Sequence, residues 1–187
     1  MRDPIPGSPE LLHEIRQLDE LLEQHTMAMG SDAVPYRNHA YRVANLCVML
    51  APTGRDQTEK IAIAAAFHDL GIWTDGTFDY LEPSVRLARH YLAGTEQRGW
   101  IPEVERMICE HHKLTGSRAD DAWLVEPFRK ADWIDVSRGA LTFGLPRRIV
   151  RAMLSAWPSA GFHQRLIHLF FERLRTNPLT PLPMVRL

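Results

Sequence analysis

The sequence is poor in cysteine and in net charge, and it lacks long apolar runs. Cys47 and Cys109 are the only cysteines among 187 residues, and their spacing fits neither a disulfide framework nor a cysteine zinc site. A net charge of −1 gives no overall attraction to nucleic acid or to an anionic membrane. No apolar run approaches the roughly 20 residues of a membrane span, and the first residues lack the basic and then apolar pattern of a secretory signal. We therefore expect a cytoplasmic protein with reduced thiols and neither a nucleic-acid nor a membrane partner.

Segments of alternating apolar and polar residues, the pattern of half-buried strands, are missing too. Apolar residues instead recur at helical spacing between prolines and glycines, which predicts an all-α bundle. A chain of this length with 45% hydrophobic residues suits one buried core. We expect residues 1–187 to form a single domain with its central part at about 35–140. The expected helices cover about 8–30, 36–50, 57–68, 82–93, 102–114, 122–137, 146–156 and 161–176.

The two ends of the chain carry distinct signals. Ser8, Pro9 and Glu10 have the character of a helix start, with an N-cap, a first-turn proline and an acid that the helix dipole favours. The proline-rich segment 177–183 cannot continue a helix, so we expect it to lie extended along the surface. We expect the first helix and the helices within 146–176 to pack on the central part.

Histidines occupy the apolar faces of two expected helices. In the second, His39 lies one turn before Val43 on the face that enters the core. In the third, His68 shares its face with Ile61 and Ala64. Both imidazoles are therefore expected to point inward.

Two aspartates accompany these histidines. Asp69 directly follows His68 at a helix exit, and Asp132 lies one turn after Phe128 on the apolar face of the sixth expected helix. An ionised carboxylate in an apolar interior needs a lysine, an arginine or a metal ion as its partner. Two imidazoles and two carboxylates from three helices form a nitrogen and oxygen donor set suited to Mn, Fe, Co, Ni, Zn or Mg.

Each of these residues has a simpler explanation when taken alone. A single histidine on an apolar face is usually a hydrogen-bonded core residue, and a single aspartate there often ties two helices together. The combination of all four favours a metal site.

The motifs around these residues resemble the HD superfamily of metal-dependent phosphohydrolases, whose pattern is a His, an adjacent His-Asp pair and a distant Asp. Here His39 lies in YRNHAYRV, His68 and Asp69 in AAAFHDLGI, and Asp132 in FRKADWIDVS. The resemblance covers about 35–140 and implies a helical bundle of the HD type with a divalent metal on these four side chains. It also implies that a metal-bound water attacks an electrophile and that Asp69 is both a ligand and the base that orients this water.

Two cations near the motifs are candidates for substrate binding. Arg42 lies three residues after His39, close to the same helix face, and Lys113 directly follows a histidine pair. Either could hold an anionic substrate group. A structural salt bridge is the alternative for Arg42, and a solvated side chain is the alternative for Lys113.

Further histidines invite comparison with those HD proteins that bind a second or third metal. His111 aligns with Ile108 on an apolar face, and His112 lies at the edge of that face. We expect one or both to reach the site, as ligands of a second metal or as neighbours that support the first ligands. His90 lies on the opposite side of its helix and is expected to face solvent.

The chain departs from the phosphohydrolase pattern at one position. Many members continue the motif as His-Asp-x-Gly-Lys, whereas Ile72 follows Gly71 here, so one phosphate contact is missing. The segment NHAYRV and the apolar residue after the glycine also resemble HD relatives that hydrate small nitriles such as cyanamide. Four nearby aromatic residues are either core residues or the lining of a small-substrate pocket: Trp73, Phe78, Tyr80 and Trp133.

We expect a hydrolase in which a metal-activated water attacks a phosphoester of a nucleotide or another small phosphorylated metabolite. Hydration of a small nitrile-like compound and di-iron oxygenation are alternatives on the same fold. A non-catalytic module that senses a ligand and holds a structural metal is a third. A catalytic metal keeps an open position, whereas protein ligands close a structural one. The expected partner is a small-molecule substrate, and a homo-oligomer is compatible with the sequence.

Overall fold

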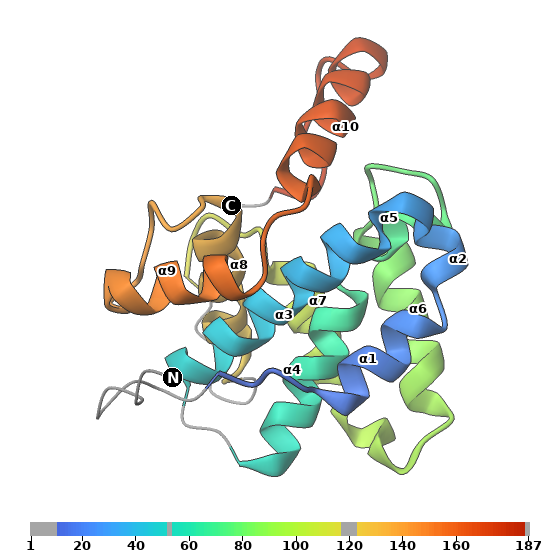
Figure 1. The fold of residues 1–187 in the computed structure, drawn as a ribbon. Helices are drawn as coiled ribbons and strands as arrows, with labels where there is room; N and C mark the ends of the chain where they lie inside the picture. Colours follow the sequence, from blue (N-terminus) through green and yellow to red (C-terminus); the bar gives the residue numbers. More distant parts are fainter. Residues whose placement is uncertain (1–10, 52–53, 117–122, 186–187) are drawn as a thin grey trace.

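All regular secondary structure in the described residues is helical. The computed structural model describes residues 11–51, 54–116 and 123–185, and it contains no strand in these ranges (Figure 1). The helices are α1 (Arg16–Glu23), α2 (Thr26–Met29), the 3-10 helix η1 (Gly30–Asp32), α3 (Ala33–Leu50), α4 (Arg55–Phe67), α5 (Gly71–Thr74), α6 (Leu81–Ala93), the 3-10 helix η2 (Glu96–Trp100), α7 (Ile101–Glu110), α8 (Val125–Val136), α9 (Arg147–Ala156) and α10 (Phe162–Thr176). The expected all-α class is confirmed.

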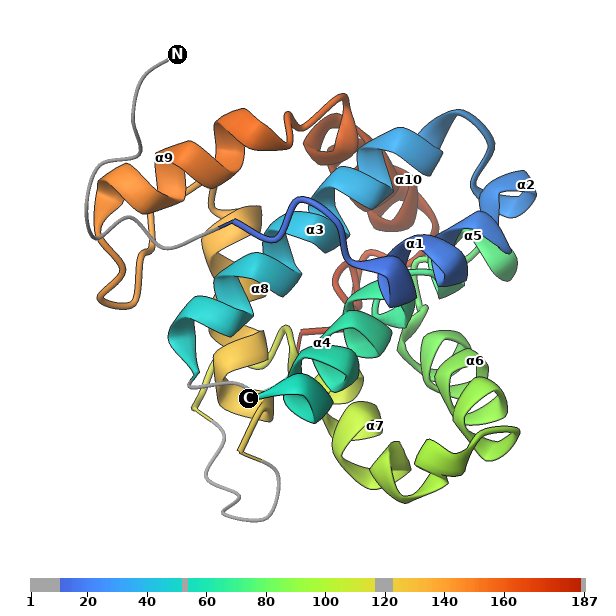
Figure 2. The ribbon, with the colours of Figure 1, turned by 60° about the horizontal axis from the view of Figure 1, so that its bottom comes forward.

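Helix α3 forms the centre of the bundle. It packs along α8 on one side and against α4 on another, and α7 contacts both α4 and α8. Helix α1 lies across α3 and α4, α6 covers α7, and α9 and the start of α10 contact α3 (Figures 1 and 2). The segments outside 35–140 therefore contact the central helices.

The end of α4 is tied to α3 by hydrogen bonds. The Tyr36 hydroxyl donates to the Ala66 carbonyl oxygen at 3.0 Å and accepts from the Asp69 amide at 3.2 Å. Buried alanines at 64–66 leave room for this close approach between helices. The junction after α4 is thereby fixed against the middle of the bundle.

The first helix is shorter than the sequence predicts. Residues 11–15 are not helical, because the Leu12 amide donates to the Asn45 side chain at 2.8 Å and the Ile15 amide donates to the Tyr41 hydroxyl at 3.0 Å. These side chains of α3 accept hydrogen bonds from backbone amides, which would have no partner within the helix if they lay in its first turn. The expected N-cap at Ser8 lies outside the described residues.

Helix α7 ends at Glu110 rather than near residue 114. The Lys113 amide closes a turn on the Glu110 carbonyl at 2.9 Å. The Lys113 carbonyl in turn accepts from Arg129 at 3.0 Å and from the Trp133 indole at 3.3 Å, both on α8. This turn places His111 and His112 beyond the helix and against α8.

The proline-rich segment 177–183 lies largely at the surface, as expected, but it forms turns rather than an extended chain. Turns form at Asn177–Thr180 and at Leu182–Val185. Met184 is 3% exposed and belongs to a small apolar cluster with Phe78 and Tyr80. The tail therefore folds back on the bundle because it can bury this methionine.

Two further expectations concern the thiols and the membrane. Cys47 and Cys109 are both free of disulfides. Among the helices of the described residues, none combines the length and apolar character that crossing a membrane requires.

Candidate metal centre

Six histidine and aspartate side chains converge where α3, α4, α7 and α8 meet. One comes from α3, two follow the end of α4, two follow the end of α7, and one comes from α8: His39, His68, Asp69, His111, His112 and Asp132. All except His112 are at most 2% exposed, and the His112 side chain is 13% exposed. We call these six residues the ligand cluster.

The imidazoles of His39 and His68 face each other with their Nε2 atoms 2.8 Å apart. The Nδ1 atom of His39 lies 2.6 Å from Asp135 Oδ2, and that of His68 lies 2.9 Å from the Ala65 carbonyl oxygen. When Nδ1 donates in both neutral rings, each Nε2 offers a lone pair. A distance of 2.8 Å between the two Nε2 atoms then requires a proton or a metal cation between them.

Two carboxylates complete this first group. Asp69 Oδ2 lies 3.5 Å from His39 Nε2 and 3.6 Å from His68 Nε2. Asp132 Oδ1 lies 3.6 Å and 3.9 Å from the same two nitrogen atoms. The four residues that the sequence singles out as metal ligands are thus brought together.

The second oxygen of each carboxylate faces the other histidine pair. Asp69 Oδ1 lies 3.3 Å from His111 Nε2, and Asp132 Oδ2 lies 3.3 Å from His112 Nδ1. His111 Nδ1 lies 2.6 Å from the Ile108 carbonyl oxygen, and His112 Nε2 lies 2.8 Å from the Tyr80 hydroxyl. Both aspartates therefore lie between two pairs of histidines.

Several buried atoms of the ligand cluster have no hydrogen-bond partner among the residues that the structure describes. They are Asp69 Oδ1, His111 Nε2 and both carboxylate oxygens of Asp132. A buried carboxylate without a partner is costly. Nitrogen and oxygen donors directed at a common centre suit a divalent transition-metal ion, so the residues present fit a metal.

The electrostatics of the cluster separate its two central histidines. Burial alone would lower the pKa of His39, but Asp135 and Asp69 outweigh it and raise this pKa to about 9. Burial, helped by the charges of His39 and His111, lowers the pKa of His68 to about 3. Burial raises the pKa of Asp132 to about 7. Burial and the neighbouring charges thus shift the pKa values of these two histidines in opposite directions.

Comparison with known protein families identifies the arrangement. Residues 36–137 match the HD domain family, and this segment includes the whole ligand cluster. The chain belongs to the HD domain family. No curated protein and no solved structure matches it. The family match supports the predicted HD-type bundle, and it does not single out the relatives that hydrate nitriles.

Asp135 lies directly beside the ligand cluster, and the sequence pattern alone did not reveal it. Its Oδ2 accepts from His39 Nδ1 at 2.6 Å and from Arg42 Nη2 at 2.8 Å, while Oδ1 accepts from Arg42 Nε. Burial would raise the pKa of Asp135, but the hydrogen bonds from His39 and Arg42 hold it well below its usual value. A carboxylate in this position fixes the ring orientation of a ligand histidine.

Arg42 lies beneath the HD site rather than in a substrate pocket. It is fully buried, and its third donor reaches the Trp157 carbonyl oxygen at 2.7 Å. With all of these contacts made inside the protein, Arg42 does not fit the expectation that it holds a substrate anion. Its geometry is that of a residue that positions Asp135.

The other candidates are placed as follows. Lys113 is partly exposed, with its Nζ 4.0 Å from Glu110 Oε2, so its role in substrate binding stays a prediction. His90 is exposed, as expected.

A cavity of about 310 Å³ adjoins the HD site at His112. Phe78, Tyr80 and Trp133 line it, whereas Trp73 packs on Tyr36 with ring centroids 4.7 Å apart. Three of the four aromatic residues noted in the sequence therefore surround this cavity.

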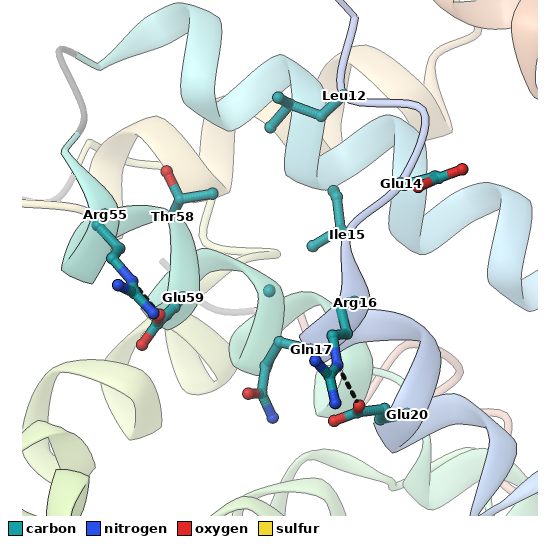
Figure 3. Close-up of a pocket in the computed structure, with 10 residues that line it drawn as sticks. Leu12, Glu14, Ile15, Arg16, Gln17, Glu20, Arg55, Thr58 and Glu59 are labelled. Atoms are coloured by element: carbon teal, nitrogen blue, oxygen red, sulfur yellow. Dashed lines mark hydrogen bonds and ion pairs between the residues drawn. The ribbon is translucent and has the colours of Figure 1, made fainter.

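A larger cavity of about 550 Å³ lies elsewhere, between α1 and the start of α4 (Figure 3). None of the ligand-cluster residues lines it, and four of its charged side chains pair with one another, as Arg16 with Glu20 and Arg55 with Glu59. The cavity at His112, in contrast, is lined by a residue of the ligand cluster.

Proposed function

We propose that this HD domain protein is a metal-dependent hydrolase that cleaves a phosphoester of a nucleotide or another small phosphorylated metabolite. The main support is the ligand cluster, in which two buried aspartates face two pairs of histidines. The family match over residues 36–137 adds phosphohydrolase-type chemistry to this geometry.

The ligand cluster offers more than the four donors of a simple site. Each aspartate has one oxygen toward His39 and His68 and the other toward His111 or His112. Carboxylates placed in this way could each supply ligands to two divalent ions, and two ions together would stabilise the attacking and the leaving oxygens of a displacement. We therefore infer that His111 and His112 hold a second ion.

The residues of the chain have separate tasks in this reaction. A bound divalent ion lowers the pKa of water toward neutrality and stabilises the negative charge that develops on the attacked group. Asp69, whose Oδ1 has no hydrogen-bond partner among the described residues, would be both a ligand and the base that orients the attacking water. Asp135 keeps the Nδ1 proton of His39 in place, so that Nε2 stays a ligand.

The experiment begins with protein stripped by a chelator and reloaded with Mn, Co, Fe or Zn. We expect hydrolysis of phosphate esters by the loaded protein, no hydrolysis by the stripped protein, and a loss of at least about a thousandfold in kcat/KM for Asp69→Asn, as for other residues that orient a nucleophile. His90→Ala, which changes an exposed histidine, serves as the matched control. Hydrolysis that persists without metal and in Asp69→Asn would contradict the proposal.

A second candidate is the hydration of a small nitrile-like compound. It is favoured by one observation, which is that no lysine or arginine lines the described part of the cavity at His112. Small nitriles are therefore included in the substrate panel, with formation of the amide or urea as the readout. Oxygen uptake by the iron-loaded protein tests the di-iron alternative that two ions would also permit. A protein that holds metal but turns over no compound would indicate the non-catalytic module instead.

A further inference from the structure

The ligand cluster is closed to solvent except at one residue. His39, His68, His111 and Asp132 are fully buried, and Asp69 is 2% exposed. His112, with its side chain 13% exposed, lines the neighbouring cavity and lies 3.3 Å from Asp132. A molecule that reaches the cluster therefore enters past His112 and through this cavity.

The cavity is formed by α8, α10, Phe78, Tyr80 and the tail residues 182–185, and we call it the tail pocket. Its mouth is apolar and open, since Ile167 is 57% exposed and Leu182 is 43% exposed. Its inner wall is apolar and covered, since Phe78 is 9% exposed and Met184 is 3% exposed. An open apolar mouth that leads to a buried polar cluster is the arrangement of a ligand-binding pocket.

The few polar groups of the tail pocket are already engaged. The Tyr80 hydroxyl is hydrogen-bonded to His112 Nε2 at 2.8 Å, and the Trp133 indole donates to the Lys113 carbonyl oxygen at 3.3 Å. No lysine, arginine, aspartate or glutamate is among the described residues that line the pocket. A charged group placed there would lose its hydration without gaining a partner.

We propose that the tail pocket binds an uncharged apolar group of the substrate, either an aryl ring or a short alkyl chain, while the reactive ester lies at the ligand cluster. The volume of about 310 Å³ is at the lower end for ligand pockets, which suits such a group alone. This inference rests on the proposed function for the identity of the reactive end. The apolar wall itself can be tested without turnover.

The test follows the side-chain methyl of Met184 by NMR in metal-loaded protein labelled at methionine methyls, with Met184→Leu to assign the signal. Phenol and a series of primary alcohols are the probes, and none of them needs hydrolysis to bind. We expect the Met184 signal to shift and binding to tighten about fourfold per added CH₂, equivalent to about 0.8 kcal/mol for each buried CH₂. No shift with any probe, or no dependence on chain length, overturns the proposal.

Two matched variants on α10 locate the binding. Ile167→Trp places a bulky group at the mouth, whereas Phe171→Trp changes a residue of similar exposure, 52%, that does not line the pocket. We expect Ile167→Trp to weaken phenol binding at least tenfold and Phe171→Trp to leave it unchanged. Equal phenol binding in both variants overturns the proposal. A Met184 methyl signal that shifts with protein concentration in the absence of phenol also overturns it, because a second copy of the chain would then occupy the pocket.

The same variants separate this inference from the proposed function. With phosphate esters, Ile167→Trp is expected to lower kcat/KM for phenyl phosphate about tenfold more than that for methyl phosphate, whereas Phe171→Trp is expected to leave both values unchanged. If phenol binds at Met184 but no ester is hydrolysed, the proposed reaction is contradicted and the apolar pocket is supported. If esters are hydrolysed at rates that do not depend on their apolar group, the pocket is contradicted and the reaction is supported.

Discussion

At the scale of single residues, Asp135 links the ligand cluster to the rest of the bundle. It accepts hydrogen bonds from His39 and from Arg42, and all three side chains are fully buried. Arg42 therefore supports the site indirectly, by compensating the charge that orients His39.

We predict that Asp135→Asn lowers the affinity for the divalent ion by about 10- to 100-fold, because supporting carboxylates of metal-bound histidines have effects of this size. Competition with a metal-sensitive dye measures the dissociation constant. The variant also leaves the buried Arg42 without its ion-pair partner, which can destabilise the fold. Urea unfolding of the variant is therefore measured as well, so that metal affinities are compared only between folded proteins. Asp56→Asn, at an exposed position, is the control. An unchanged affinity in Asp135→Asn would show that His39 needs no such support.

Lys113 is tested against a neighbour of similar character. Lys113 and Lys130 have side-chain exposures of 29% and 35%, and each lies near a glutamate of its own segment. If Lys113 holds the phosphoryl group, Lys113→Ala raises KM for phosphorylated substrates about tenfold or more, the size expected for a lost charge-assisted hydrogen bond. Lys130→Ala should leave KM unchanged in the same steady-state assay. Equal KM values in the two variants would remove Lys113 from the site.

The sequence predicts the residues that point into the ligand cluster better than the residue that orients one of them. His39, His68 and Asp132 lie on apolar helix faces, and the structure buries all three. Asp135 escapes the same reasoning, because its contacts depend on how α3 and α8 pack on each other. The spacing of apolar residues predicts which face of a helix is buried. It does not predict which residue of another helix contacts that face.

At the scale of elements, the junction between α4 and α6 sets the position of Tyr80. The Gly71 amide donates to the Ser84 hydroxyl at 3.0 Å, which joins α5 to α6 directly after the His68-Asp69 pair. A Cβ atom at Gly71 would lie 2.6 Å from the Tyr80 carbonyl oxygen and 2.8 Å from Pro83 Cβ. Glycine is thus required here by close packing rather than by an unusual backbone angle.

We predict that Gly71→Ala destabilises the protein by about 1 to 3 kcal/mol, the usual cost of forcing extra atoms into a packed contact. Urea unfolding measures the loss. Gly99→Ala is the matched control, because a Cβ atom there meets no atom within 4 Å. The packing argument fails if the two variants unfold at the same urea concentration.

The bounds of elements are predictable from sequence only where neighbours do not intervene. Helices α6, α9 and α10 begin and end within a residue of their expected bounds. The start of α1 and the end of α7 differ because Asn45 and Tyr41 on α3, and Arg129 and Trp133 on α8, bind backbone groups of those segments. Hydrogen bonds between distant parts of the chain thus override local propensity.

At the scale of the whole molecule, the ligand cluster joins segments from across the chain. Its residues lie between positions 39 and 132, and Phe162 at the start of α10 stacks on the His39 ring with centroids 4.1 Å apart. Beyond this contact, α10 projects from the bundle (Figure 1), and the tail returns to bury Met184. The sequence predicts the helical bundle and the inward-facing histidines and aspartates, but the tail pocket forms only where α8, α10 and the tail come together.

The central claim is that the ligand cluster binds divalent metal, and counting the ions on each chain tests it most directly. Mass spectrometry of metals is applied to protein that has been stripped, reloaded with one divalent metal and freed of unbound ions. We predict two ions per chain in the wild type and in His90→Ala, and retention of at most one weakly held ion in Asp132→Ala, because Asp132 faces both histidine pairs. A wild-type chain that retains no ion, or an Asp132→Ala variant that retains as many as the wild type, would contradict the account.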